Sequence, residues 1–106
     1  MAAPFGDKIR ELRKKKGMTL DQLATATDSS KSYIWELENK DPPRPSAEKI
    51  AKIAAALDVT SDYLMGVDDG NLQAAEDKAF FRKYSQMSPE ARARLRRLAK
   101  ALDEDE

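Results

Sequence analysis

One short segment of the chain carries polar side chains at positions that share one face of a helix. If residues 30–38 are helical, Ile34 and Leu37 form the apolar face. Four other side chains then point outward: Lys31, Ser32, Trp35 and Glu36. Ammonium, hydroxyl and carboxylate groups can pair with the edges of DNA bases, and an indole can contact a thymine methyl group or a sugar. The segment therefore predicts base contacts in the major groove.

The alternative is that these four residues are ordinary solvated positions on a helix surface. Trp35 argues most strongly against that alternative, because a large aromatic side chain on an exposed helix face usually has a partner that covers it. Trp35 could also be tucked against a neighbouring helix of its own domain. The sequence leaves this point open.

A helix that enters a groove of DNA needs a preceding helix and a tight turn to position it. Thr19 and Gln22 match a capping box, which predicts the start of that preceding helix. Residues 27–30 (Thr-Asp-Ser-Ser) are rich in side chains that bond to the nearby backbone, so a turn with an N-cap at Ser29 or Ser30 is expected. Residues 19–39 therefore predict a helix-turn-helix.

Further helices on both sides would supply a core. Gly17 is expected to end a first helix, and Ser46 and Thr60 are expected to cap two later helices, the second of which stops at Gly66. Residues 39–45 hold three prolines, which predict an extended connection. No segment alternates with the period of two typical of a strand, so the fold is predicted to be all-α. The apolar stripes are Phe5, Ile9 and Leu12 in the first helix, and Ile50, Ile53, Ala54 and Leu57 in the fourth.

The composition changes after residues 68–71 (Asp-Asp-Gly-Asn), which have turn character. We expect a DNA-binding domain over residues 1–67, a linker over 68–75 and a helical extension over 76–106, whose last four acidic residues are disordered. Ser88 and Pro89 predict the start of a second helix in the extension. Its apolar side chains are expected to dimerise or bind a partner: Phe80, Phe81, Tyr84, Leu95, Leu98 and Leu102. The extension could instead fold back on its own domain, since two heptads are short for a stable coiled coil.

Composition narrows the classes of function. Nineteen basic residues balance nineteen acidic ones, so the net charge is zero and gives no global signal for nucleic acid. The chain has no Cys and no His, which argues against disulfides, a metal site and most catalytic constellations. It shows no signal peptide and no apolar run long enough to span a membrane. We therefore expect a cytoplasmic protein without cofactors that is not an enzyme.

The sequence resembles the phage repressor and Cro family of helix-turn-helix proteins, also called the xenobiotic response element family. The similarity covers about residues 5–65 and rests on residues 9–13 (IRELR), 17–24 (GMTLDQLA), 30–39 (SKSYIWELEN) and 45–59 (PSAEKIAKIAAALDV). The resemblance implies a lambda-repressor-like domain of five helices, in which the third helix reads the bases with Lys31, Ser32 and Glu36. It also implies a structural ion pair between Arg13 and Glu38.

The same resemblance implies contacts to the DNA backbone on both sides of the reading helix. The residues concerned are Thr19, Leu20, Tyr33, Asn39, Lys40 and Arg44. The chain departs from the family in the central turn, where Thr27 and Asp28 replace the usual buried leucine and glycine. Asp28 must therefore adopt a left-handed conformation or bend the turn differently.

Three classes of function remain in view, the third being a small enzyme. The first is a dimeric repressor that binds double-stranded DNA and reads a two-fold operator in the major groove. The second is an antitoxin-like or partner-regulated DNA-binding module, whose C-terminal helices bind a second protein. Nothing in the order of residues indicates the grouped acid and base side chains of a small enzyme.

Overall fold

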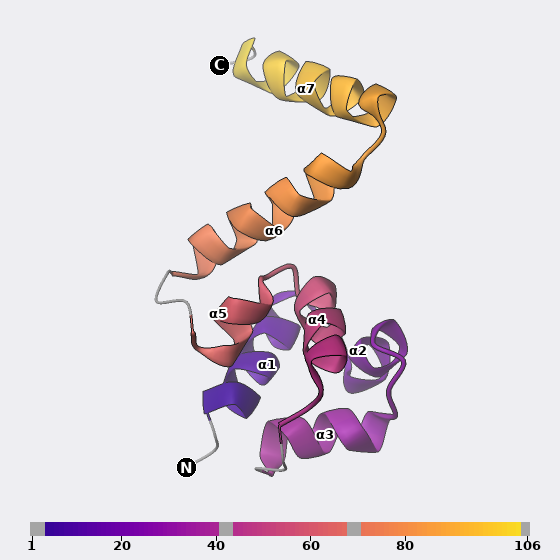
Figure 1. Cartoon of the computed structure of the whole chain (residues 1–106), viewed down its shortest axis with the longest axis vertical. Coiled ribbons are helices and arrows are strands. Elements are labelled where there is room, and N and C mark those ends of the chain that lie inside the picture. The colour runs from indigo at the N-terminus through magenta and orange to yellow at the C-terminus, as the bar shows by residue number, and fades with distance from the viewer. Residues whose placement is uncertain (1–3, 41–43, 68–70, 105–106) are drawn as a thin grey trace.

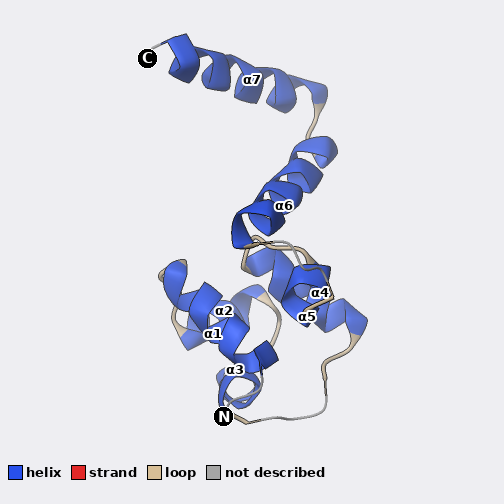
Figure 2. Ribbon diagram, turned by 90° about the vertical axis from the view of Figure 1, so that its left-hand side faces the viewer, coloured by secondary structure: helices blue, strands red, loops and turns tan. Residues whose placement is uncertain are grey.

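The computed structural model describes residues 4–40, 44–67 and 71–104, and helices are the only regular elements in these ranges. Five helices form the N-terminal unit: α1 (Pro4–Lys15), α2 (Leu20–Ala26), α3 (Lys31–Asn39), α4 (Ala47–Ala56) and α5 (Ser61–Met65). The extension follows as α6 (Leu72–Gln86) and α7 (Pro89–Glu104). The predicted all-α fold, five helices and a helical extension, is confirmed (Figures 1 and 2).

Local capping explains where the helices of the N-terminal unit begin. The Thr19 hydroxyl accepts a hydrogen bond from the N–H of Gln22 (3.0 Å), and the N–H of Thr19 donates to Gln22 Oε1 (2.8 Å). The predicted capping box is therefore present. Ser30, Ser46 and Thr60 cap α3, α4 and α5 by accepting from the N–H three residues later. Each hydroxyl satisfies an N–H that has no partner within its helix.

The apolar stripes of the five helices meet in one core. α1 packs against α3 and α5, α2 packs against α3 and α4, and α4 packs against α5. The close approach of α1 to α3 requires Gly6, because a Cβ there would lie 2.4 Å from the carbonyl oxygen of Leu37. The core side chains are Ile9, Leu12, Leu23, Ala24, Ile34, Leu37, Ile50, Ile53, Ala54, Leu57, Val59 and Leu64.

The extension joins the unit through the first turns of α6. The side-chain oxygen of Asn71 accepts from the N–H of Ala74 (2.8 Å) and caps α6, while Leu72 and Ala75 pack on the core. Because these apolar anchors make residues 72–75 helical, the linker is shorter than the expected 68–75, of which 68–70 lie outside the described residues. Further along α6, Lys83 forms an ion pair with Asp58 in the turn after α4.

Beyond this junction the extension leaves the unit. α7 contains no buried residue. Asp103 and Glu104, which were expected to be disordered, form the end of α7 because they continue a run of good helix formers; residues 105–106 lie outside the described residues. No helix in the described ranges has the length and apolar character needed to cross a membrane.

The molecule is elongated. Its principal extents are 48 × 27 × 24 Å, and its radius of gyration is 15.8 Å, whereas a compact domain of this length has about 13 Å. α3 lies at one end of the long axis and α7 lies at the opposite end (Figure 1). The fold therefore separates the two surfaces that the sequence analysis singled out.

Candidate DNA interface

The four residues predicted to contact bases all lie on the exposed face of α3. Trp35 exposes 45% of its surface, so it is not tucked against a neighbouring helix. The opposite face of α3 is buried through Ile34 and Leu37. An α-helix with one exposed face at the edge of a small domain can enter a major groove about 12 Å wide. The exposed side chains are Lys31, Ser32, Trp35 and Glu36.

Ammonium groups lie near both ends of this face. Lys31 Nζ lies 3.8 Å from Asp21 Oδ2 of α2, and both side chains are well exposed. Such a pair contributes little to stability, so little is lost when Lys31 turns to another acceptor. At the other end, Lys40 Nζ lies 5.8 Å from the centre of the Trp35 ring, within the range of a cation–π interaction.

The residues expected to contact the DNA backbone flank α3. They are the exposed Thr19, Asn39, Lys40 and Arg44, and the half-buried Leu20 and Tyr33. Leu20 and Tyr33 both pack on the core. Burial raises the pKa of Tyr33 further above neutral pH, and the protonated phenol can donate a hydrogen bond. The assignment of these six residues to DNA stays a prediction.

The ion pair expected between Arg13 and Glu38 is present and lies under α3. Arg13 Nε donates to Glu38 Oε2 (2.7 Å) and Nη2 donates to Oε1 (3.0 Å). The hydrogen bond to Glu38 is the main cause that raises the pKa of Arg13. A third donor of Arg13, Nη1, bonds the carbonyl oxygen of Met18 (2.9 Å). This bidentate contact therefore ties α1 both to α3 and to the start of α2.

Sequence reasoning missed a second link between α1 and α3. Arg10 donates a hydrogen bond to the side-chain oxygen of Asn39, and Asn39 Nδ2 donates to the carbonyl oxygen of Trp35 (2.9 Å). Arg10 Nε also lies 3.5 Å from Glu38 Oε1. The available signal was the spacing of Arg10 and Arg13, which places both guanidinium groups on one face of α1. The C-terminal end of α3 is therefore fixed by two arginines.

The turn between α2 and α3 is held by α4, which sequence reasoning also missed. Thr27 is fully buried, and Asp28 has a φ of 54°, the left-handed alternative of the two foreseen for it. Lys49 Nζ donates to the carbonyl oxygens of Thr27 (2.8 Å) and Asp28 (3.2 Å) and to Ser29 Oγ (2.9 Å). Lys52 Nζ lies 3.1 Å from the Asp28 carboxylate. No local pattern could signal these contacts, because they join residues at least 20 positions apart.

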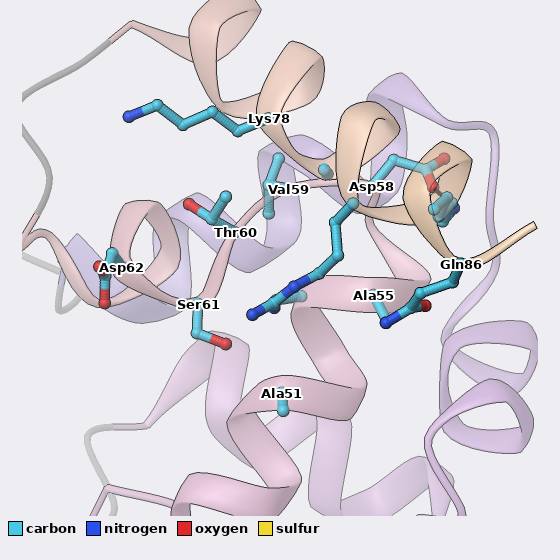
Figure 3. A pocket seen from close by; sticks show the side chains of 13 residues that line it. Ala51, Ala55, Asp58, Val59, Thr60, Ser61, Asp62, Lys78 and Gln86 are labelled. Carbon is cyan, nitrogen blue, oxygen red and sulfur yellow. Dashed lines mark hydrogen bonds and ion pairs between the residues drawn. The ribbon is translucent and has the colours of Figure 1, made fainter.

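A cleft of about 620 Å³ lies at the junction with the extension. Figure 3 shows Ala51 and Ala55 of α4 on one side and Gln86 of α6 near them, with Asp58 and Asp62 also on the lining. Acidic and basic side chains share its walls, so neither sign of charge dominates. No group of three metal-ligating side chains occurs among the residues that the structure describes. The cleft therefore marks the place where α6 crosses the end of α4.

Comparison with known proteins identifies a family to which the chain belongs and several transcriptional regulators that it resembles. A family model described as helix-turn-helix matches residues 9–64. The uncharacterized HTH-type transcriptional regulator RghRB of Bacillus subtilis (strain 168) is 38% identical over 72 residues, which are 68% of this chain and 51% of that protein. The chain spans about half the length of the curated relatives that it matches.

Two solved structures are similar in shape. The crystal structure of SinR, a master regulator for biofilm formation, in complex with DNA is 34% identical and covers 57% of this chain and 97% of its own, with a TM-score of 0.54. The structure of the SinR protein/SinI protein complex is 26% identical and covers 94% of this chain and 98% of its own, with a TM-score of 0.55. The second likeness extends well into the helical extension.

Proposed function

This chain belongs to the helix-turn-helix family of the Cro/C1 type, and from that premise we propose that it is a transcriptional regulator that binds DNA sequence-specifically through α3. The observation that carries the proposal is the exposed face of α3, with Lys31, Ser32, Trp35 and Glu36 together on it. Lys31 donates to guanine N7 or O6, Glu36 accepts from cytosine N4, Ser32 does either, and Trp35 contacts a thymine methyl group.

Contacts to phosphates orient the domain on the duplex in this proposal. Lys40 and Arg44 neutralise backbone charge beyond the end of α3, and Asn39 and Tyr33 supply hydrogen-bond donors. Thr19 and Leu20 approach the backbone where α2 begins. The relative RghRB is an HTH-type transcriptional regulator, which supports regulation over catalysis. We propose the cytoplasm as the place where this chain binds DNA.

We further propose that the protein works as a homodimer that represses transcription from a two-fold operator. Residues 1–67 form the DNA-binding domain, and residues 76–106 form the dimerisation element. The extension exposes Phe80 (55%), Phe81 (67%), Leu98 (62%) and Leu102 (70%), more apolar surface than a pair of helices keeps in water. A groove between α6 and α7 is lined by Phe80, Phe81, Tyr84, Leu95, Arg96 and Ala99.

The charge pattern of α7 favours a second copy of this chain as the occupant of that groove. After Glu90, α7 carries only basic charges as far as Lys100, and its last two residues are acidic: the basic residues are Arg92, Arg94, Arg96, Arg97 and Lys100, and the acidic ones are Asp103 and Glu104. Two α7 helices that meet antiparallel place these opposite charges across from each other, whereas parallel helices place like charges together. A two-fold dimer of this kind matches half-sites about one helical turn of DNA apart.

A partner-regulated module is the second candidate function. Its support is the likeness over 94% of this chain to the SinR protein/SinI protein complex, because that likeness extends into the extension. In this candidate a different protein occupies the groove between α6 and α7 and controls how many dimers form. The DNA-reading role of α3 is the same in both.

The test is selection of duplexes from a random pool with the full chain, followed by fluorescence anisotropy at two salt concentrations. The double variant Lys31→Ala and Ser32→Ala is expected to lose about tenfold or more in affinity for selected duplexes and little for unselected ones. Lys40→Ala is expected to weaken binding to selected and unselected duplexes alike. It is also expected to lower the slope of log affinity against log salt by about one. Lys100→Ala on α7 is the charge-matched control. Failure to enrich any duplex, or equal binding by the double variant, would overturn the proposal.

A further inference from the structure

We propose that Lys49 is a positioning residue that sets the tilt of α3, and with it the preference for bases, by tying α4 to the turn between α2 and α3. The inference rests on the proposed function of α3 as the reading helix. It assigns part of the sequence preference to a side chain that lies behind α3 rather than on its exposed face.

The contacts of Lys49 use the full donor capacity of its side chain. An ammonium group has three N–H donors. Lys49 Nζ has three acceptors within hydrogen-bond distance, namely the carbonyl oxygens of Thr27 (2.8 Å) and Asp28 (3.2 Å) and the hydroxyl of Ser29 (2.9 Å). These acceptors belong to three consecutive residues, so one side chain of α4 holds three successive positions of the turn.

The turn has hydrogen bonds of its own, from Thr27 Oγ1 to the carbonyl oxygen of Leu23 (2.8 Å) and from the N–H of Ser29 to that of Ala24 (2.8 Å), but its backbone conformation carries a cost that Lys49 helps to offset. Asp28 has a φ of 54°, a region that side chains other than glycine adopt at a cost. The neighbouring contact from Lys52 reaches only the Asp28 carboxylate, and that carboxylate is 80% exposed, so solvent weakens it. Lys49 is half-buried and bonds the backbone itself. It is therefore the stronger restraint on the turn.

Lys49 also contacts α3 directly. Its Nζ lies 6.0 Å from the centre of the Tyr33 ring, in the first turn of α3, which begins right after the Ser30 cap. A helix of nine residues is about 13 Å long, and Arg10 and Arg13 hold its end, so a tilt of about 10° moves its start by about 2 Å. Hydrogen bonds to base edges tolerate only a few tenths of an ångström. A change at Lys49 is therefore expected to alter the contacts of α3 with base edges more than the contacts with phosphates.

The experiment compares Lys49→Met, which keeps the aliphatic stem, with Lys49→Gln, which keeps a polar end and guards against a folding defect. Lys52→Met, one turn along the same helix, is the matched control. In the free protein, residual dipolar couplings of the backbone N–H groups report the direction of α3 relative to α1 and α4. Anisotropy then gives affinities for a duplex selected by the wild type and for an unselected duplex.

Both Lys49 variants are expected to change the couplings of α3 and to lower the ratio of selected to unselected affinity about tenfold, with unselected binding within about twofold. Lys52→Met is expected to leave the couplings of α3 and the ratio of affinities unchanged. Unchanged couplings in both Lys49 variants overturn the proposal, as does an equal loss on both duplexes. If the wild type selects no duplex, the proposed function fails, and the couplings still decide whether Lys49 orients α3.

Discussion

Glu38 is the one charged side chain that is fully buried among the described residues, with 1% exposure. Its carboxylate accepts two hydrogen bonds from Arg13 and lies between α1 and α3. Replacing Glu38 by Gln removes the charge but keeps the size, and it leaves the Arg13 guanidinium underneath α3 without a counter-charge. Loss of one partner of a buried ion pair costs about 3 kcal/mol, so we expect the free energy of unfolding to fall by about that amount.

Urea unfolding followed by far-UV circular dichroism measures this change. Glu36→Gln is the matched control, because it makes the same substitution two residues earlier on the exposed face of α3. An exposed substitution of this kind changes the free energy of unfolding by less than about 0.5 kcal/mol. If the two substitutions lower the free energy of unfolding equally, the buried ion pair with Arg13 adds nothing to the stability that an exposed glutamate lacks.

In the turn between α2 and α3, the effects of backbone conformation and of charge on stability can be tested separately at Asp28. Asp28→Val is expected to lower the free energy of unfolding by about 1–2 kcal/mol, because a β-branched side chain is strained at a φ of 54°. Asp28→Asn removes the ion pair with Lys52 but tolerates the left-handed region, so it is expected to stay within about 0.5 kcal/mol of the wild type. Thermal unfolding of both variants checks this. A loss in Asp28→Asn as large as in Asp28→Val would assign the cost to the charge.

The elements that sequence analysis predicted well are those whose signals are local. Thr19, Ser30, Ser46 and Thr60 each cap a helix through a bond that spans three residues, so a short window of sequence contains the whole interaction. The exposed face of α3 was predictable for the same reason, since Ile34 and Leu37 define the opposite face by their spacing alone.

The contacts that sequence analysis missed join elements that are distant along the chain. Lys49 and the Thr27 carbonyl are 22 residues apart, and Arg10 and Asn39 are 29 residues apart. A lysine or an arginine on a helix has the same local pattern whether it is solvated or reaches a turn of another helix. The start of α6 was placed too late because Leu72 and Ala75 become core residues only once α6 lies against the unit.

These contacts together fix α3 at both ends. The turn and Lys49 hold its start, while Arg10 and Arg13 hold its end through Asn39 and Glu38. A recognition element that is already ordered loses less conformational entropy on binding. α3 is therefore suited to read DNA without rearrangement of the domain.

The surface proposed to bind DNA and the surface proposed to dimerise lie far apart in the molecule. α3 and α7 lie at opposite ends of the long axis, and α6 spans the space between them (Figure 1). Asp58 forms ion pairs with Lys16, just after α1, and with Lys83 of α6, so α6 contacts the unit here as well as through Leu72 and Ala75. A dimer formed through the extensions therefore leaves both α3 helices open to DNA.

Phe81→Ser is expected to convert this dimer into a monomer, because Phe81 lines the groove between α6 and α7 and is 67% exposed in the single chain. Val67→Ser is the control, since Val67 is 68% exposed but lies outside that groove. Sedimentation velocity at micromolar protein gives the oligomeric state, and anisotropy compares a duplex with two half-sites and a duplex with one. Two linked DNA-binding domains gain avidity on a duplex with two half-sites. We therefore expect Phe81→Ser to lose about tenfold or more in affinity for that duplex and nothing for the duplex with one half-site. A wild type that sediments as a monomer and binds both duplexes as Phe81→Ser does would contradict the homodimer.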